Sequence, residues 1–313
     1  MSLDKKFQEL FLKVSSRAAF SSYKLVGKKD KVSADKAAVD SMRLELNKID
    51  MNGEIVIGEG ELDEAPMLYI GEKLGTGNGP NLDIAVDPLE GTNFAAYNLP
   101  GALSVIAVSE KNNLFKAPET YMEKISAKVN EKGVIDLDYS TKKNIYNLSE
   151  YLNKKPEYLT VCILDRPRHQ KLIYELNNLK VKLKLITDGD VSGALLVTDK
   201  KYKVDMFMGI GGGPEGVLAA AALDTFECLF QGRFLFETEN EISRAKNMGI
   251  KNLKKKYELN EIISGDSIFC ATGITSGDLL NGIQIENNHF ISETLVTHKS
   301  SKLKKIIKNV EKI

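Results

Sequence analysis

Residues 84–92 read Ile-Ala-Val-Asp-Pro-Leu-Glu-Gly-Thr, a short apolar strand followed by an acidic turn. Asp87 is expected to end the strand, because Pro88 fixes the backbone as the chain leaves the sheet. Gly91 permits a tight turn, and a short helix is expected to begin near Thr92. Two carboxylates in such a turn can share metal ions, while the hydroxyl of Thr92 and the N–H groups that follow it can face a bound anion. The alternative is an ordinary turn with a threonine cap.

The same pattern of an apolar run and a glycine-containing acidic turn recurs at four other places. Loops that leave strand ends in layered α/β folds are where ligands bind, so the pattern indicates a cluster of carboxylates in a cleft. The four further stretches read IVIGEGELDE (55–64), LITDGD (185–190), MFMGIGGGPEG (206–216) and FCATGITSGD (269–278).

Clustered carboxylates repel one another and need protons or cations for compensation. The chain has three histidines, without the HxxxH or CxxC spacing of a zinc site. Oxygen ligands favour Mg²⁺ or Mn²⁺ as the cofactor, and paired hard ions in a carboxylate cleft commonly serve phosphate ester hydrolysis.

The composition sets the class of protein. The 313 residues are enough for about two domains, and the 43 basic and 43 acidic residues cancel. We therefore expect no nucleic acid or membrane partner. The N-terminus lacks the pattern of a signal peptide, which makes the cytoplasm the expected location. Cys162, Cys228 and Cys270 lie in apolar stretches and are expected to be buried thiols.

Short apolar runs alternate with helical periodicity along the chain, which predicts a mixed α/β fold. The polar stretch 142–157 is the expected domain boundary, and the lysine-rich tail 300–313 is expected to form an amphipathic helix. Strands are predicted at 54–57, 83–86, 103–108, 159–164, 183–186, 204–208, 267–271 and 293–297, and helices at 7–27, 33–49, 67–74, 169–179, 191–197, 214–223 and 241–247.

The motif Asp-Pro-Leu-Glu-Gly-Thr at 87–92 resembles the signature of the lithium-sensitive phosphatase superfamily. The preceding residues 55–79 resemble one branch of it, the class II fructose-1,6-bisphosphatases. Further matches keep the order of that family between about residue 28 and residue 298. They lie at 30–35, 117–124, 166–169, 188–190, 209–216 and 271–275.

This resemblance implies a set of site residues. The metal ligands of the family fall on Asp35, Glu59, Asp87, Glu90 and Glu215. Thr92 matches the catalytic threonine, whose hydroxyl would orient the attacking water, with Glu59 and Asp87 also in catalytic roles. The substrate-binding positions fall on Glu90, Gly91, Thr92, Tyr121, Arg166, Pro167, Arg168, Asp188, Gly189, Asp190 and Gly212.

The arginines and Tyr121 suit the second phosphate, because a guanidinium offers forked donors to phosphate oxygens. Asp188 and Asp190 would accept hydrogen bonds from sugar hydroxyls.

The resemblance implies a layered αβαβα fold, with an N-terminal metal-binding subdomain (1–158), a C-terminal sugar-phosphate-binding subdomain (159–313) and the active site between them. The implied activity is hydrolysis of the 1-phosphate of fructose 1,6-bisphosphate by a homo-oligomer, a dimer or a tetramer. Alternatives within the phosphatases are sedoheptulose 1,7-bisphosphatase activity, alone or as a second activity, and inositol or nucleotide phosphatases.

Two alternatives come from other classes. Residues 211–216 formally fit the GxGxxG pattern of dinucleotide binding. However, Asp224 comes too early for the acidic partner of that fingerprint, and Pro214 would crowd the phosphate turn. A non-catalytic magnesium-dependent binding protein is the other alternative. The full set of five carboxylates together with Thr92 argues against it.

Overall fold

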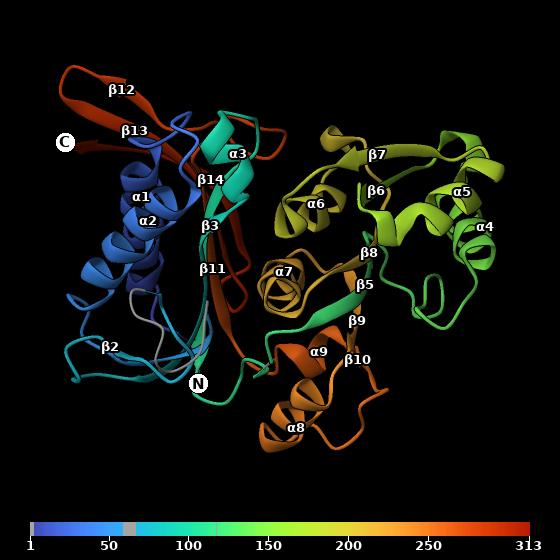
Figure 1. Ribbon diagram of the computed structural model, residues 1–313, viewed down its shortest axis with the longest axis horizontal. Helices are drawn as coiled ribbons and strands as arrows, with labels where there is room; N and C mark the ends of the chain where they lie inside the picture. Colours follow the sequence, from blue (N-terminus) through green and yellow to red (C-terminus); the bar gives the residue numbers. More distant parts are fainter. Residues whose placement is uncertain (1–2, 59–66, 117) are drawn as a thin grey trace. The chain divides into compact units, whose positions relative to one another are not determined.

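The computed structural model describes residues 3–58, 67–116 and 118–313. The chain divides into two compact units, Met1–Lys116 with Ile263–Ile313 and Ala117–Ile262. Each unit has a sheet with its own helices, so the expected α/β fold of two subdomains is confirmed. The units differ from the expected division at residue 158, because β11 (Ser267–Gly273) returns to pair with β4 (Leu103–Glu110). Both coloured ends of the chain, blue and red, therefore belong to the first unit (Figure 1).

The sheet of the first unit has the order β12-β13-β11-β4-β3-β1-β2, and β14 pairs along the whole of β13. Only the β1–β3 pairing is parallel among the strands that the structure describes in this sheet. The remaining bounds are β1 Asn52–Ile57, β2 Lys73–Leu74, β3 Asn81–Glu90, β12 Gln284–Glu286, β13 His289–His298 and β14 Leu303–Lys312.

Helices α1 (Lys6–Tyr23) and α2 (Lys31–Leu46) cover one face of this sheet (Figure 1). Their apolar residues, spaced three and four apart, form one core cluster with the strands. Helix α2 starts before the expected Ser33, because the Asp30 side chain accepts a hydrogen bond from the Ser33 N–H at 2.9 Å and caps the helix.

The sheet of the second unit has the order β10-β9-β5-β8-β6-β7. Strand β6 is parallel to β7 and β8, whereas β5 is antiparallel to β8 and β9. Strands β5 and β9 were not expected, because charged and polar residues interrupt their apolar pattern. The bounds are β5 Tyr121–Ala127, β6 Thr160–Leu164, β7 Lys182–Ile186, β8 Met206–Gly212, β9 Leu229–Leu235 and β10 Lys256–Glu258.

Helices cover both faces of the second sheet (Figure 1). Helices α4 (Thr141–Leu152) and α5 (Gln170–Asn178) pack on one face and share a core with Ile125 of β5. Helices α6 (Asp190–Leu195) and α7 (Gly213–Thr225) pack on the other face. Helices α8 Glu239–Asn247 and α9 Leu259–Ile262 complete the unit. The stretch 142–157 thus forms most of α4 instead of a linker.

Two further sequence predictions were wrong. Residues 67–74, all described, form turns and β2 instead of a helix, because Gly71 has a positive φ of 95°. The tail forms β14 instead of an amphipathic helix. Its residues pair one by one with β13, and Ile307 packs against the first core, so pairing with a neighbouring strand decided the conformation.

Candidate active site

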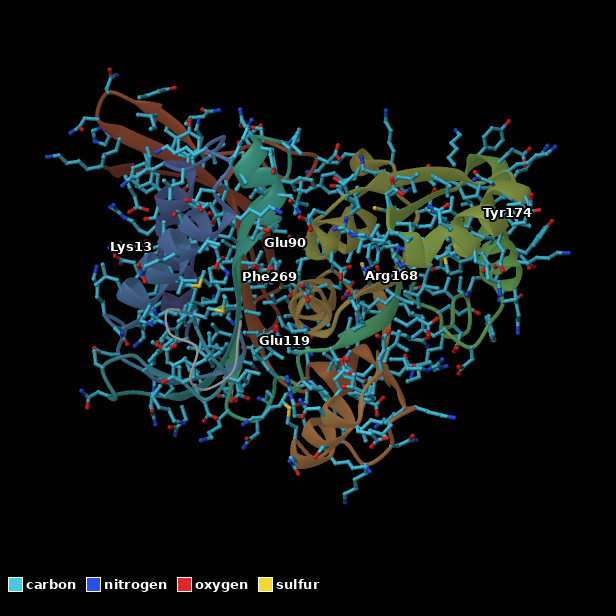
Figure 2. All side chains as sticks on the ribbon, viewed as in Figure 1. Lys13, Glu90, Glu119, Arg168, Tyr174 and Phe269 are labelled. Carbon is cyan, nitrogen blue, oxygen red and sulfur yellow. The ribbon has the colours of Figure 1, made fainter. Side chains whose placement is uncertain are left out.

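Asp87 and Glu90 lie at the end of β3, at a bulge (Glu90 is labelled in Figure 2). Asp87 pairs with Val105 and Glu90 with Leu103, so β3 carries one extra residue between the two carboxylates. Residues three apart normally face opposite sides of a sheet, but the extra residue makes these two equivalent to positions two apart. Leu89 packs in the core with α1 and α2. The two carboxylates therefore face away from that core.

Gly91 separates the bulge from α3 (Thr92–Tyr97). It caps the helix in the left-handed conformation, with φ of 80°, and a Cβ added to it would lie 2.8 Å from Cδ2 of Phe94. Glycine alone fits this position without strain. The expected helix start at Thr92 is thereby confirmed, and the Thr92 hydroxyl follows directly on the two carboxylates.

Asp35 is the fifth residue of α2, which packs against β3 and α3. One carboxylate oxygen of each of Asp35, Asp87 and Glu90 is fully shielded from solvent. Buried carboxylate oxygens without nitrogen or sulfur ligands form a donor set that fits Mg²⁺ or Mn²⁺. The first unit thus places three of the five expected metal ligands on elements that pack together.

Glu59, the fourth expected ligand in this part of the chain, lies outside the described residues. Among the residues that the structure describes, no three Asp, Glu, His or Cys side chains form a group that could hold a metal ion. The fifth ligand, Glu215, belongs to the second unit. The complete metal site therefore stays a prediction.

Tyr121 and Arg168 form the centre of a second group of expected residues, in the second unit. Tyr121 begins β5 and pairs with Gly212 at the end of β8. The Arg168 guanidinium stacks over the Tyr121 ring at 4.8 Å, and its Nε donates to the carbonyl of Ile210 at 2.9 Å. With respect to the described residues, these contacts use only Nε and the face of the guanidinium, and its terminal nitrogens suit an anionic ligand. Tyr121, Arg168 and Ile210 are called the arginine clamp below.

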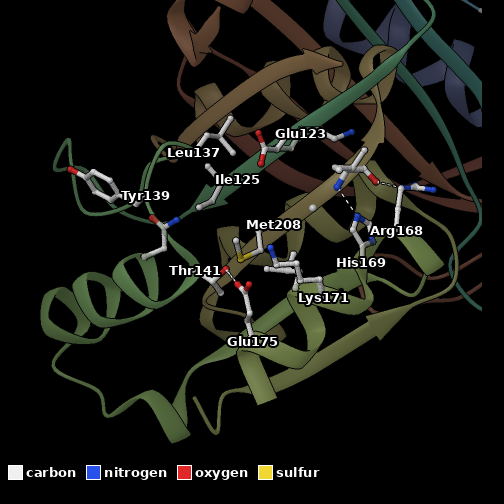
Figure 3. Close-up of a pocket in the computed structure, with 15 residues that line it drawn as sticks. Glu123, Ile125, Leu137, Tyr139, Thr141, Arg168, His169, Lys171, Glu175 and Met208 are labelled. Atoms are coloured by element: carbon white, nitrogen blue, oxygen red, sulfur yellow. Dashed lines mark hydrogen bonds between the residues drawn. The ribbon is translucent and has the colours of Figure 1, made fainter. Parts of the chain in front are cut away.

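His169, next to Arg168, holds the same strand residue from the other side. Its Nδ1–H donates to the Leu164 carbonyl at 2.6 Å, and its Nε2 accepts from the Ile210 N–H at 2.7 Å. Since a carbonyl only accepts and an N–H only donates, the buried ring is neutral in this arrangement. Burial lowers the pKa of His169 and favours the neutral ring. Figure 3 shows the hydrogen bonds of Arg168 and His169 to the strand.

Arg166 and Asp188 come together at the ends of β6 and β7, with Nη2 of Arg166 3.9 Å from Oδ1 of Asp188. Pro167 begins the 3₁₀ turn that carries the arginine clamp. Gly189 has φ of 85° and caps α6, so Asp190 is the first residue of that helix. The sequence Asp-Gly-Asp is thus a left-handed helix cap, equivalent to the turn at Gly91.

Asp190 and Glu215 pack against two adjacent glycines of the β8–α7 turn. A Cβ added to Gly211 would lie 1.9 Å from Oδ2 of Asp190, and one added to Gly212 would lie 1.8 Å from Oε2 of Glu215. Burial raises the pKa of Glu215, and the nearby Asp190 acts in the same direction. The structure therefore brings these two expected residues to one turn, and a cation near Glu215 would stabilise its charged form.

The sequence analysis missed Lys124, a buried lysine in β5. Its ammonium contacts Oδ2 of Asp190 and donates to the Gly212 carbonyl at 2.7 Å. The available signal was its place between Met122 and Ser126, where strand alternation puts three side chains on one buried face. A charged residue on such a face needs a partner, which the sequence alone did not identify.

A cavity of about 270 Å³ borders the arginine clamp (Figure 3). Its lining includes Thr141 and Asn144 of α4 and Leu172 of α5, which places it on the α4–α5 face of the sheet. Lys124 of β5 also lines it, although the Lys124 ammonium contacts Asp190. Among the expected site residues that the structure describes, Arg168 alone lines it. Its lining does not include Asp190 or Glu215, so the cavity is a neighbour of these candidate site residues.

The family described as "Bacterial fructose-1,6-bisphosphatase, glpX-encoded" matches residues 5–311. The chain belongs to this family. The class II resemblance expected from the sequence is thereby confirmed.

Several relatives are 43% identical to this chain. Fructose-1,6-bisphosphatase 1 class 2 of Escherichia coli (strain K12) aligns over 314 residues, covering 96% of this chain and 93% of that protein. Fructose-1,6-bisphosphatase class 2 of Haemophilus influenzae aligns over 311 residues, covering 95% and 93%. D-fructose 1,6-bisphosphatase class 2/sedoheptulose 1,7-bisphosphatase of Prochlorococcus marinus (strain MIT 9301) aligns over 299 residues, covering 91% and 90%.

Among solved structures, the MJ0109 gene product, named inositol monophosphatase–fructose 1,6 bisphosphatase, is 12% identical with a TM-score of 0.36. It covers 63% of this chain, which covers 73% of that structure. Within the described residues, no helix has the length and apolarity needed to cross a membrane.

Proposed function

We propose that this chain hydrolyses the 1-phosphate of fructose 1,6-bisphosphate and releases fructose 6-phosphate and phosphate. The observation that carries the proposal is the bulge in β3, which turns Asp87 and Glu90 to one side of the sheet directly before Thr92. The family match over residues 5–311 and the names of relatives 43% identical to the chain support the choice of substrate.

The first unit is the proposed place of the chemistry. The expected ligands Asp35, Glu59, Asp87, Glu90 and Glu215 would hold Mg²⁺ or Mn²⁺, whose positive charge would stabilise the phosphoryl oxygens and lower the pKa of the attacking water. The Thr92 hydroxyl orients that water by a hydrogen bond, and the α3 backbone after Gly91 donates to the phosphate. A bulged strand end positions these groups more rigidly than a free loop would.

The second unit is the proposed place where the rest of the substrate binds. The arginine clamp and Arg166 bind the 6-phosphate, because their guanidinium groups donate pairs of hydrogen bonds to phosphate oxygens. Asp188 and Asp190 accept hydrogen bonds from the sugar hydroxyls, with Gly189 and Gly212 giving backbone contacts. Two phosphate-binding regions in one chain favour a bisphosphate over a monophosphate.

Sedoheptulose 1,7-bisphosphate is the second candidate substrate. It is supported by the name of the Prochlorococcus relative, which includes both activities. The two substrates share the bisphosphorylated ketose ends, so the same clamp and the same acidic turn would serve both. We further propose that the protein acts in the cytoplasm as a homo-oligomer, which light scattering on the purified protein would test.

The test is phosphate release from fructose 1,6-bisphosphate, sedoheptulose 1,7-bisphosphate and inositol 1-phosphate, each with Mg²⁺ or Mn²⁺. We expect the first to be a good substrate and the last to be poor. Asp87→Asn should abolish activity, lowering turnover at least about a hundredfold. The matched control is Asp83→Asn, a buried residue on the same face of β3, where burial raises the pKa of the carboxyl and a neutral amide is tolerated. Activity on inositol 1-phosphate alone would refute the substrate assignment.

A further inference from the structure

Lys124 is buried in the second unit, with 1% of its surface exposed. Its aliphatic chain lies under the first turn of α7, where a Cβ added to Gly216 would be 3.2 Å from its Cδ. Its ammonium contacts Asp190 and donates to the Gly212 carbonyl. A buried ammonium is tolerated only where its charge is compensated and its protons are used. The burial of the Lys124 ammonium therefore depends on Asp190 and the Gly212 carbonyl, and the positions of these two groups depend on Lys124.

The two partners of Lys124 belong to different parts of the proposed substrate site. Asp190 starts α6 and packs against Gly211, while Gly212 is the residue against which Glu215 packs. One ammonium thus joins the start of α6 to the β8–α7 turn. Because each carboxylate rests directly on a glycine backbone, a shift of this turn would move both carboxylates.

We propose that Lys124 is a positioning residue for sugar binding: it keeps the Asp190 carboxylate directed at the sugar, and it fixes the turn that carries Gly212. The proposal deepens the proposed function and rests on it. Asp190 has one carboxylate oxygen, Oδ2, in contact with Lys124, and the other, Oδ1, has no hydrogen-bond partner among the described residues although it is buried. That second oxygen is the one we assign to a sugar hydroxyl.

The electrostatic surroundings fit this assignment. The Asp190 carboxylate lies against the backbone of Gly211, and the Lys124 ammonium is its charged partner there. Removal of the ammonium would leave Oδ2 of Asp190 without its charged partner, so that the Asp190 side chain would turn away from its present position. This change would remove an acceptor from the sugar.

The test compares Lys124→Met with Ser126→Ala. Ser126 lies two residues further on the same buried face of β5, and its hydroxyl has no hydrogen-bond partner among the described residues. Calorimetric titration with fructose 6-phosphate in EDTA reads sugar binding without any metal or turnover. We expect Lys124→Met to weaken binding at least about tenfold, as for loss of a charged hydrogen bond, and Ser126→Ala to change it less than twofold.

A double-mutant cycle with Asp190→Asn separates positioning from general destabilisation. If Lys124 acts on the sugar through Asp190, then Lys124→Met should weaken fructose 6-phosphate binding much less in the Asp190→Asn background than in the wild type, and the smaller remaining loss would come from the turn that carries Gly212. The double variant also removes both charges of the pair, which keeps the comparison available if Lys124→Met alone does not fold.

Unchanged fructose 6-phosphate affinity in folded Lys124→Met would overturn the inference. An equal loss of affinity on Lys124→Met in the wild type and in the Asp190→Asn variant would also overturn it. Both outcomes are distinct from failure of the proposed function. That failure would appear in the wild-type protein, as absence of phosphate release from fructose 1,6-bisphosphate.

Discussion

At the scale of single residues, the candidate site depends on side chains that are held by backbone groups. The Nε of Arg168 donates to the Ile210 carbonyl, and its guanidinium stacks on the Tyr121 ring. The side chain is therefore already ordered, so binding of a ligand would cost little side-chain entropy. His169 fixes the N–H of the same Ile210. A phosphate would therefore meet a preformed donor group.

Arg168→Ala should raise KM for fructose 1,6-bisphosphate more than it lowers kcat, because the clamp binds a phosphate that does not react. We expect an increase in KM of about ten- to a hundredfold, from the loss of charged hydrogen bonds. Steady-state kinetics on both bisphosphates would measure it. Lys143→Ala removes another cation stacked on a tyrosine of the same unit, Tyr139, and should leave KM unchanged. A fall in kcat at constant KM would contradict the assigned role.

His169 should make the stability of the protein sensitive to acid. Burial places the folded-state pKa of its ring below the ordinary value of 6.5, so the unfolded chain binds the additional proton more readily. Above pH 6.5 the neutral ring makes its full contribution to the free energy of unfolding. This contribution decreases as the pH falls below 6.5, until the pH has passed the folded-state pKa.

Urea unfolding between pH 7.5 and 5 would measure this effect. His169→Gln can accept from the Ile210 N–H and donate to the Leu164 carbonyl without titrating, so its free energy of unfolding should fall less steeply with acid than that of the wild type. His289→Gln, at an exposed position, is the control. Equal slopes for wild type and His169→Gln would exclude the histidine as the cause.

At the scale of elements, the same local arrangement occurs in both units. A strand leads into a glycine with positive φ, which caps a short helix whose first residue is an expected site residue, Thr92 after Gly91 and Asp190 after Gly189. The glycine turns the chain sharply and leaves the first helical side chain at the strand end. In β3 the bulge has a further effect, because it places the Asp87 and Glu90 carboxylates on the same side of the sheet.

Gly91→Ala should destabilise the protein more than Gly77→Ala. Both glycines have φ of 80°, but an added Cβ meets Phe94 at 2.8 Å in the first case and nothing within 4 Å in the second. At both positions an alanine in the left-handed conformation should lower the free energy of unfolding by about 1–2 kcal/mol. At Gly91 the clash of the added methyl group with Phe94 should lower it by about 1–3 kcal/mol more. Thermal unfolding measures the difference, and Gly91→Ala should also lower turnover. Equal melting temperatures would show that α3 accommodates the methyl group.

At the scale of the whole molecule, the chain builds most of one unit, crosses to build the other and returns. Strands β11 and β13 complete the first sheet beside β4 and β3, although about 160 residues lie between them in sequence. The expected ligands Asp35, Asp87 and Glu90 belong to the first unit and Glu215 to the second.

Under the proposed function, Mg²⁺ or Mn²⁺ should raise the melting temperature of the protein, because the ion binds the folded chain. At a hundredfold excess over Kd the ion would add about 2.7 kcal/mol to the free energy of unfolding. Differential scanning calorimetry with and without EDTA would show the shift, which Asp87→Asn should reduce and Asp83→Asn should retain. A shift of the same size in Asp87→Asn would argue that the ion binds elsewhere.

Local chemistry and pattern determined much of this protein from the sequence alone. Gly91 and Thr92 predicted the turn and the start of α3, and the helical spacing of Phe7, Phe11 and Val14 predicted α1, because these signals act over one or two turns of chain. The expected end of the strand at Asp87 was wrong, since β3 continues through Pro88 to Glu90. The acidic strand ends identified candidate ligands by their chemistry.

Only the tertiary structure decided what depends on distant partners. The tail reads as helix or strand by itself and became β14 because β13 lies beside it. The bulge of β3 is defined by its register against β4, which no local pattern shows. Lys124 required Asp190, 66 residues away, to explain its burial. In each case the free energy comes from contacts between segments far apart in the chain, so the residues alone could not reveal which contacts form.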